Sequence, residues 1–252
     1  MIEILRPIFV GDLADRGEAV VLADDDRPAL PGHSLADPAT IDAVVDRYAE
    51  TYPGADRRAV ASFWTQWYFA QLIPPVAAAA LMLNRVLPAA LAEISVIRAD
   101  KGHPIAFRLH DDGQPTTETD VFRRLAPLID GHIAPFIAAW APHTRVAPRL
   151  YWNNAAVYLH WILGEIAAHP LADDRVRAEA DQLMHSRDQP DGRPNLLCTP
   201  IQTVEEDGEI RRWRRLCCLR YRLPEIAECG TCPHLRARLR KAASTQEIAA
   251  VG

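Results

Sequence analysis

The stretch AVASFWTQWYFAQLIPPVAAAALMLN, residues 59–84, contains no charged residue. A membrane-spanning helix needs about 20 mainly apolar residues, so its length alone would permit insertion. However, Thr65, Gln66, Gln71 and Asn84 are polar, and Pro74-Pro75 interrupts the stretch in the middle. Proline lacks a backbone N–H and disfavours helix at the residue before it. The stretch therefore predicts two buried helices of a soluble protein, over about 56–72 and 76–91, which meet at a proline corner.

The flanking sequence predicts more helix and two β-hairpins. Asp37 and Pro38 precede an apolar repeat at helical spacing, which is typical of a helix start. ISVIRA and PIAFRL surround a turn with Gly102, and CTPIQTV and EIRRWRRL surround EEDG, as in hairpins. Further helices are expected over residues 119–129, 133–140, 153–169 and 173–185, with a basic helix in the tail, HLRARLRKAASTQEIAA (234–250).

The expected fold class is α+β, with a helix-dominated body and a short cysteine-rich module at the C-terminus. At 252 residues and 49% apolar composition, the chain is long enough to bury a core without disulfides. The first 40 residues have no sustained period and are expected to be loops and extended segments. We expect a body over residues 1–195, and a second unit over 196–252 that contains a hairpin, the cysteines and the tail helix. These units can pack as one domain.

Charge is divided unevenly along the chain. Residues 211–252 hold ten Lys or Arg and three Asp or Glu, although the whole chain carries a net charge of −5. Such a basic tail on an acidic body often marks an anionic partner. Nucleic acid is one such partner, but the sequence contains no helix-turn-helix, zinc-finger or RNA-binding signature. We therefore expect no nucleic-acid binding.

Four of the five cysteines form the pattern Cys217-Cys218-x10-Cys229-x2-Cys232. The N-terminus, MIEILRPIFVGDLADRG, lacks the basic start and long apolar run of a secretory signal, so we expect a cytoplasmic protein. In a reducing compartment, clustered cysteines are typical of metal-binding or catalytic sites. The C-x-x-C half suits zinc, but adjacent cysteines in extended chain point to opposite sides. A 2Fe–2S cluster, whose two irons each take two thiolates, fits the pattern better.

Other interpretations of the cysteines remain open. They could be four unrelated buried residues, or Cys229 and Cys232 could form a redox dithiol. The dithiol would leave Cys217 and Cys218 without a role, and clustering within 16 residues disfavours chance burial. Cys198 lies outside the pattern and is expected to be structural.

Basic and aromatic residues beside the cysteines are candidates for tuning a cluster or docking an electron donor. Four thiolates, two sulfides and two ferric ions carry a net negative charge, which nearby cations would offset. The candidates are Trp213, Arg214, Arg215, Arg220 and Arg222. A solvated basic face is the alternative for each arginine.

The spacing on RRLCCLRYRLPEIAECGTCP resembles the C-terminal signature of the FhuF-type ferric-siderophore reductases. SFWTQWYFAQLIPPVAAAAL and LYWNNAAVYLHWIL resemble the same family, the latter as a W-G-N-like turn that opens a helix, with Asn153 in place of the glycine. The resemblance covers about residues 60–235. It implies a cytoplasmic 2Fe–2S protein, with Cys217, Cys218, Cys229 and Cys232 as ligands.

The resemblance also implies a function, which is one-electron reduction of Fe(III) in a hydroxamate-type siderophore to release Fe(II). No HExxH, GxSxG, GxGxxG or P-loop pattern is present, so electrons would come from a separate flavin- or ferredoxin-type protein. A transient association with a siderophore importer is a further implied partner. The candidate substrate contacts are Trp64, Trp67, Tyr68, Trp152 and Asn154, although Trp and Tyr at helical spacing are more often core residues.

Two other functions remain open. The helical body could bind a siderophore or a synthetic intermediate of one, with the cysteines holding a structural zinc. The chain could also be an iron–sulfur sensor whose basic tail contacts nucleic acid. Colour separates the first of these from the reductase, because a 2Fe–2S protein is red-brown and a zinc protein is colourless.

Overall fold

The apolar stretch forms one continuous helix, α3 (Arg57–Met82), in the computed structural model, which describes residues 1–206 and 208–241. The prediction of two helices meeting at a proline corner is wrong. Pro74 and Pro75 lie inside α3 and are both buried. A proline inside a helix costs about 3 kcal/mol. The helix continues because burial of nearly all its residues outweighs that cost.

The remaining elements confirm the helix-dominated α+β class. The helices are α1 (Ala14–Gly17), α2 (Pro38–Ala49), α4 (Val121–Arg124), α5 (Ala126–Leu128), α6 (Ala134–Thr144), α7 (Pro148–Ala168) and α8 (Asp174–His185). The strands are β1 (Val20–Val21), β2 (Ala29–Pro31), β3 (Arg85–Val86), β4 (Ser95–Arg98), β5 (Pro104–Arg108), β6 (Gln114–Pro115), β7 (Ile201–Glu206) and β8 (Glu209–Arg214). A helix also covers 233–241. The rest of the expected tail helix lies outside the described residues.

Several local predictions are confirmed and others need correction. Asp37 caps α2 by accepting from the Thr40 N–H, and both expected hairpins form as antiparallel pairs, β4–β5 and β7–β8. The helix expected over 119–129 is instead split into α4 and α5, followed by a π-helical turn, Ile129–Ile133. The W-G-N-like stretch does not open a helix, because α7 already begins at Pro148.

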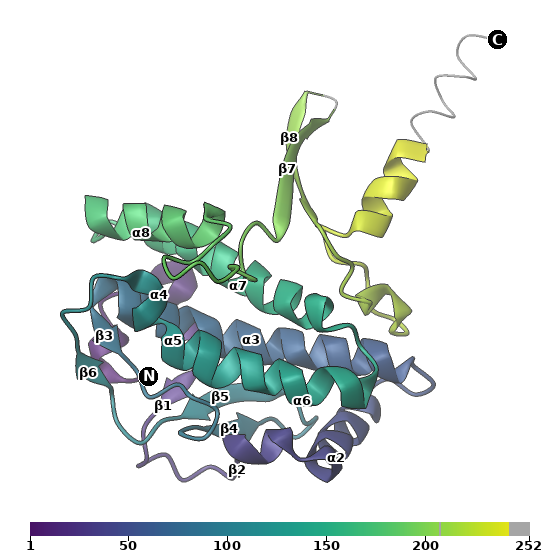
Figure 1. Ribbon diagram of the computed structural model, residues 1–252. Helices are drawn as coiled ribbons and strands as arrows, with labels where there is room; N and C mark the ends of the chain where they lie inside the picture. The colour runs from purple at the N-terminus through teal and green to yellow at the C-terminus, as the bar shows by residue number, and fades with distance from the viewer. Residues whose placement is uncertain (207, 242–252) are drawn as a thin grey trace.

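The molecule is layered around α3. A four-stranded sheet of order β1-β5-β4-β2 lies against one side of α3, and α7 packs along another side (Figure 1). The first strands, β1 and β2, come from the N-terminal segment that was expected to be loops and extended chain. An aromatic stack joins α3 to α6, since Trp64 lies 4.7 Å from Trp140 between ring centroids.

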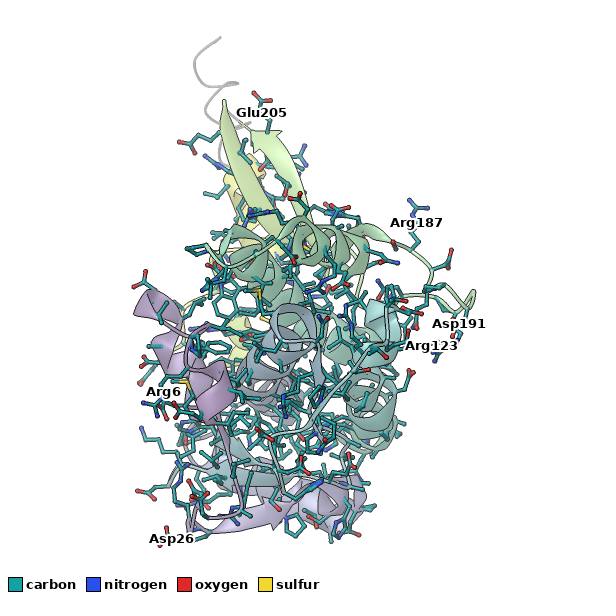
Figure 2. The ribbon with its side chains drawn as sticks, turned by 90° about the vertical axis from the view of Figure 1, so that its left-hand side faces the viewer. Arg6, Asp26, Arg123, Arg187, Asp191 and Glu205 are labelled. Atoms are coloured by element: carbon teal, nitrogen blue, oxygen red, sulfur yellow. The ribbon has the colours of Figure 1, made fainter. Side chains whose placement is uncertain are left out.

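The β7–β8 hairpin projects from the α7 side of the body, away from the sheet (Figure 1). In the turned view, Glu205 near the hairpin tip and Asp26 near the sheet lie at opposite ends of the molecule (Figure 2). The four clustered cysteines follow the hairpin directly, so they are on the α7 side of the body. No helix among the described residues is long and apolar enough to cross a membrane.

Candidate iron–sulfur site and its surroundings

The two halves of the cysteine pattern are brought together by the chain that leaves β8. The Arg214 N–H donates to the Thr231 carbonyl at 2.8 Å, which ties the end of β8 to the C-x-x-C segment. Within that segment, the Cys232 N–H donates to the Cys229 carbonyl at 2.9 Å and closes a tight turn. The first of these bonds places the C-x-x-C segment next to the end of β8, which lies more than ten positions earlier in the sequence.

The four thiols lie close together, and two of them form a measured pair. The Sγ atoms of Cys218 and Cys229 lie 3.9 Å apart. Cys217 lies near both Cys218 and Cys232, whose thiols act together with burial to raise its pKa. A tetrahedral metal with metal–sulfur bonds of about 2.3 Å holds two thiolates about 3.8 Å apart. The Cys218–Cys229 spacing therefore fits two ligands of one iron. In residues 1–206 and 208–241, no three His, Cys, Asp or Glu side chains converge closely enough for a single ion.

Burial and mutual contact shift the pKa values of these thiols. Burial raises the pKa of Cys217 to about 11. The contact with Cys229 lowers the pKa of Cys218 below its usual value, and the nearby Arg214 charge lowers it further. The same contact raises the pKa of Cys229. The thiolate form of Cys218 is thus favoured electrostatically, and the thiolate is the form that binds a metal.

Arg214 is a buried cation whose surroundings fit an anionic cluster. Its side chain is 5% exposed, and one guanidinium nitrogen donates to the amide oxygen of Asn154. Its Nε has no hydrogen-bond partner, and no carboxylate pairs with it among the described residues. A buried charge is normally paired. A negatively charged cluster beside Cys218 would supply the missing counter-charge, so the residues present fit a 2Fe–2S group.

A buried polar network connects this site to the helical body. The Ser62 hydroxyl of α3 donates to the Cys218 carbonyl at 2.8 Å. Asn154 of α7 donates to the Ser62 carbonyl at 3.2 Å and to the Thr65 hydroxyl at 3.2 Å, while its oxygen accepts from Arg214. Asn154 therefore holds both the cysteine segment and its buried cation. A sequence pattern alone does not show this role, because the partners lie far apart in the chain.

The other candidate tuning residues lie around the site in different ways. Arg220 stacks over the Phe63 ring at 5.2 Å, and Arg222 pairs with Asp56 at the start of α3 at 2.6 Å. Arg215 is exposed, which agrees with the alternative that it is part of a solvated basic face. Trp213 is buried and donates to Glu206 at 2.9 Å. His234 follows the motif and packs against the Tyr221 ring at 4.8 Å.

The predicted substrate contacts need correction. Trp64, Tyr68 and Asn154 are fully buried, so their side chains have no surface to offer a ligand. Trp64 and Tyr68 are part of the aromatic core, which agrees with the alternative that Trp and Tyr at helical spacing are core residues. Trp67 is 37% exposed and Trp152 is half-buried, so only these two retain surface. Cys198 is half-buried outside the cysteine pairs.

Helix α7 also lines a cleft that the sequence did not predict. It has a volume of about 800 Å³ and lies between α7, the end of α8 and the β7–β8 hairpin. Tyr158, Trp161 and Gly164 line it at spacings of three residues on one face of α7. That spacing is present in the sequence, which predicts a helix over 153–169 but no cleft beside it.

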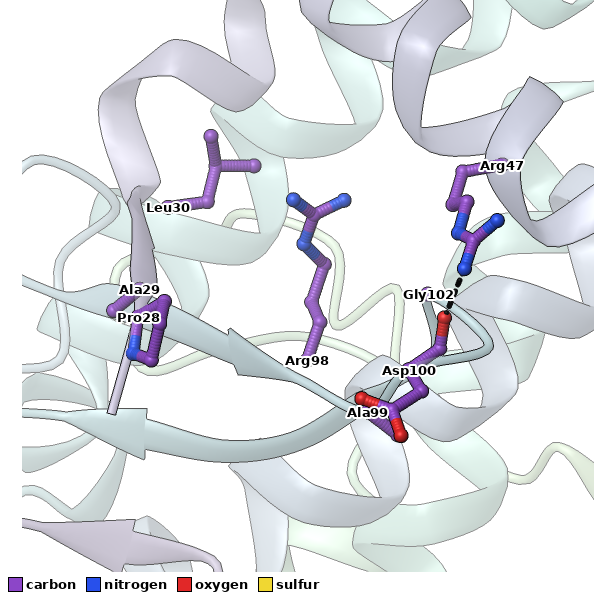
Figure 3. A pocket seen from close by; sticks show the side chains of 8 residues that line it. All are labelled: Pro28, Ala29, Leu30, Arg47, Arg98, Ala99, Asp100 and Gly102. Carbon is purple, nitrogen blue, oxygen red and sulfur yellow. Dashed lines mark hydrogen bonds between the residues drawn. The ribbon is translucent and has the colours of Figure 1, made fainter.

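A smaller hollow of about 260 Å³ lies by the sheet (Figure 3). Arg47 and Arg98 reach into it, and Arg47 donates to the Asp100 carbonyl at 2.6 Å. It is lined by residues of β2, β4 and α2 together with the β4–β5 turn, and by no cysteine. The cysteine pattern therefore takes no part in this hollow.

Paired thiols beside a buried guanidinium, on a helix-dominated body, define a protein of the 2Fe–2S class. Residues 214–234 match the FhuF 2Fe-2S C-terminal domain, and residues 62–210 match the family described as "Ferric iron reductase FhuF-like transporter". The chain belongs to the FhuF family. The cofactor expected from the cysteine pattern, a 2Fe–2S cluster, is thereby confirmed.

A curated relative and two solved structures are similar to this chain. The "Ferric siderophore reductase" of Escherichia coli (strain K12) is 26% identical over 179 residues, which are 70% of this chain and 66% of that protein. Aerobactin synthetase IucA of Klebsiella pneumoniae matches 74% of this chain and 37% of its own, with 12% identity and a TM-score of 0.50. Petrobactin biosynthesis protein AsbB of Bacillus anthracis matches 95% of this chain and 46% of its own, with 13% identity and a TM-score of 0.51. The two structures show a shared fold only.

Proposed function

We propose that this protein is a one-electron reductase of Fe(III) held by a hydroxamate-type siderophore. The observation that carries the proposal is the cluster of four thiols, with Cys218 and Cys229 3.9 Å apart, beside the buried Arg214, which has no carboxylate partner among the described residues. The family and the curated relative support the same activity. A 2Fe–2S group bound there supplies one-electron transfer.

The positions of the thiols suggest how the ligands are shared. Cys218 and Cys229 would hold one iron, because their sulfurs already have the separation of two ligands on one tetrahedral metal. Cys217 and Cys232 would hold the other. Each iron thus takes one cysteine from the adjacent pair and one from the C-x-x-C turn, which explains why adjacent cysteines can serve one cluster.

Arg214 would favour uptake of the electron. Reduction adds a negative charge to the site, and a fixed buried cation stabilises that charge and raises the reduction potential. Asn154 holds the guanidinium in position through its amide oxygen. Hydroxamate oxygens bind Fe(III) more strongly than Fe(II), so a single electron is enough to loosen the substrate iron.

The cellular setting completes the proposal. We place the protein in the cytoplasm, where a separate flavin- or ferredoxin-type donor would supply the electron, with transient association with a siderophore importer. Residues 1–195 would form the siderophore-binding body and residues 196–252 the cluster-bearing unit. The basic residues of the second unit, including the exposed Arg215, offer a docking surface for an acidic donor.

The test is made on protein purified without oxygen. We expect about two irons per chain from the two-iron cluster, with visible charge-transfer bands and an S = 1/2 paramagnetic resonance signal after dithionite reduction. The reduced protein is then mixed with ferrioxamine B, and cluster reoxidation is followed together with Fe(II) trapped by ferrozine. The gallium complex of the same chelator is the matched control, because gallium(III) accepts no electron.

The outcomes separate the proposal from its alternatives. Reoxidation by the ferric but not the gallium complex, with matching Fe(II), supports the reductase. A cluster that ferricyanide oxidises but ferrioxamine B leaves reduced contradicts it. A colourless protein with one zinc would make the cysteines a structural site and leave only a binding function for the body.

A further inference from the structure

The cleft on α7 is large enough for a chelated metal ion. Its volume of about 800 Å³ lies within the range of about 300–1,000 Å³ that is usual for small-molecule sites. Its walls come from five places in the chain, namely α1, α7, the end of α8, the β7–β8 hairpin and Thr231 of the cysteine segment. Such a meeting of separate elements is where ligand sites commonly occur.

The cleft reaches the cysteine module at two points. Thr231, which lies between Cys229 and Cys232, lines the cleft, and its carbonyl accepts from the Arg214 N–H at 2.8 Å. Tyr158 also lines the cleft, and its hydroxyl lies within the electrostatic influence of Cys218 and Arg214. A ligand in this cleft would therefore lie against Thr231 of the C-x-x-C turn that carries two of the thiols.

The lining combines aromatic surface with a positive balance of charge. Trp161 offers a broad ring, and the Arg16 guanidinium lies over it at 5.5 Å from the centroid. Arg212 lines the opposite wall, and Glu165 contributes the only carboxylate among the lining residues. Burial lowers the pKa of His160, which keeps that lining side chain neutral near pH 7.

We propose that this cleft binds the ferric siderophore, and that it favours a ferric chelate bearing a free carboxylate over one bearing an ammonium. The proposal rests on the proposed function and locates its substrate. A reduced 2Fe–2S cluster held by the four cysteines would supply one electron, which would convert Fe(III) in the cleft to Fe(II). The separate donor protein would return one electron to the oxidised cluster.

Gly164 provides a way to fill the cleft without disturbing the fold. A Cβ added there would meet no atom within 4 Å, and the residue lies in the interior of α7. Replacing glycine inside a helix also raises helix stability. Gly164→Phe should therefore fold, keep its iron and occupy the cleft. Ala178→Phe is the matched control, since it adds the same ring at an exposed position of α8 that does not line the cleft.

Three measurements are made on each cluster-loaded variant, the third of which is the rate of its oxidation by ferricyanide. Calorimetry gives the affinity for the gallium complex of desferrioxamine B, and stopped-flow absorption gives the rate of reoxidation by the ferric complex. We expect Gly164→Phe to weaken binding and slow reoxidation by about tenfold or more, which corresponds to about 1.4 kcal/mol. Its oxidation by ferricyanide should stay at the wild-type rate, and Ala178→Phe should behave as wild type in all three.

The result also tells the two proposals apart. Equal binding and reoxidation in Gly164→Phe and wild type would overturn the cleft while the reductase stands. A wild-type protein that no ferric hydroxamate oxidises would overturn the reductase itself. Tight gallium-complex binding that Gly164→Phe abolishes, without any oxidation by the ferric form, would leave the cleft as a binding site.

The charge preference is tested with two matched probes. Desferrioxamine B ends in an ammonium, and its N-succinyl derivative ends in a carboxylate, on the same chelating chain. We expect wild type to bind the gallium complex of the succinyl form more tightly, and Arg212→Gln to reduce that preference by about two- to fivefold. An equal or reversed preference in wild type would overturn the charge assignment.

Discussion

The central helix α3 and the cysteine segment, residues 217–234, are held in place by opposite means. Nearly every residue of α3 is buried, and its aromatic rings stack on those of α6. The cysteine segment contains one short 3-10 turn, Arg220–Arg222, and the start of the helix over 233–241. Its ties to α3 include the Ser62 bond to the Cys218 carbonyl and the Arg222–Asp56 ion pair.

This difference indicates which interactions stabilise each region. Apolar burial stabilises α3 whatever is bound to the thiols, at roughly 25 cal/mol per Å² of surface removed from water. The cysteine segment has little such burial, so its geometry should depend on the metal–sulfur bonds. In small metal-bound modules, the free energy of metal binding is largely free energy of folding.

Loss of a ligand gives the largest expected effect. Cys218→Ser should remove nearly all bound iron, because it breaks one sulfur pair and leaves Arg214 without its counter-charge. The helical content of the body should be unchanged. Iron analysis and far-ultraviolet circular dichroism of the purified variant measure the two effects together.

Cys198→Ser is the matched control for that experiment. Cys198 is half-buried and lies outside the sulfur pairs, so full iron content is expected. Full occupancy in Cys218→Ser would contradict the ligand assignment. Loss of helical content together with the iron would show that the body and the module fold as one unit, and the contrast between them would fail.

The sequence predicts these two regions to different extents. Helical spacing correctly places α2, α7 and α8 within a few residues, because each has a continuous apolar face. The prediction for α3 was wrong because the proline pair was expected to end a helix. That expectation holds for exposed or isolated helices and omits the stabilisation that comes from packing on every side. Local patterns cannot measure that packing, which comes from chain far away in the sequence.

For the candidate site, ligand chemistry was easier to predict than position. The cysteine spacing alone indicated a two-iron cluster, because adjacent thiolates suit two metals better than one. The pairing of Cys218 with Cys229 depends on how the chain folds back after β8, which no local pattern records. Asn154 was predicted to contact substrate, yet it binds Arg214, a residue 60 positions away.

The buried histidine against α3 gives a second, smaller effect. His132 is fully buried between the Tyr68 hydroxyl at 2.6 Å and the Ala89 carbonyl at 2.7 Å. Burial lowers its pKa from 6.5 to about 4. Between those values the unfolded chain binds a proton that the folded protein does not, so stability should fall as the pH falls. Urea unfolding should show a loss of about 2 kcal/mol between pH 7 and pH 5 from this group.

His132→Gln should remove that part of the pH dependence, while His33→Gln, at an exposed position, should keep it. An unchanged slope in His132→Gln would assign the pH dependence to other groups. Cluster absorption, followed in the same samples, should persist until the body unfolds. Bleaching of the cluster before any loss of helix would instead mark the cysteine module as the acid-sensitive region.

The exposed link between the two regions gives the smallest expected effect. Arg222 pairs with Asp56 across a surface where the side chains are 40% and 23% exposed, and such pairs contribute about 0–1 kcal/mol. Arg222→Ala should therefore lower the free energy of unfolding by less than about 1 kcal/mol and leave the iron content unchanged. Urea unfolding and iron analysis of the variant measure both.

Asp56→Ala should cost more than Arg222→Ala, although both remove the same ion pair. Asp56 also caps α3 by accepting from the Arg58 N–H at 3.0 Å, and loss of a cap costs about 1 kcal/mol. The difference between the two variants thus measures the cap together with the Asp56–Arg58 ion pair, which Asp56→Ala also removes. If Arg222→Ala instead releases iron, this exposed pair holds the cysteine segment, and the buried Ser62 and Asn154 contacts are not sufficient to position it.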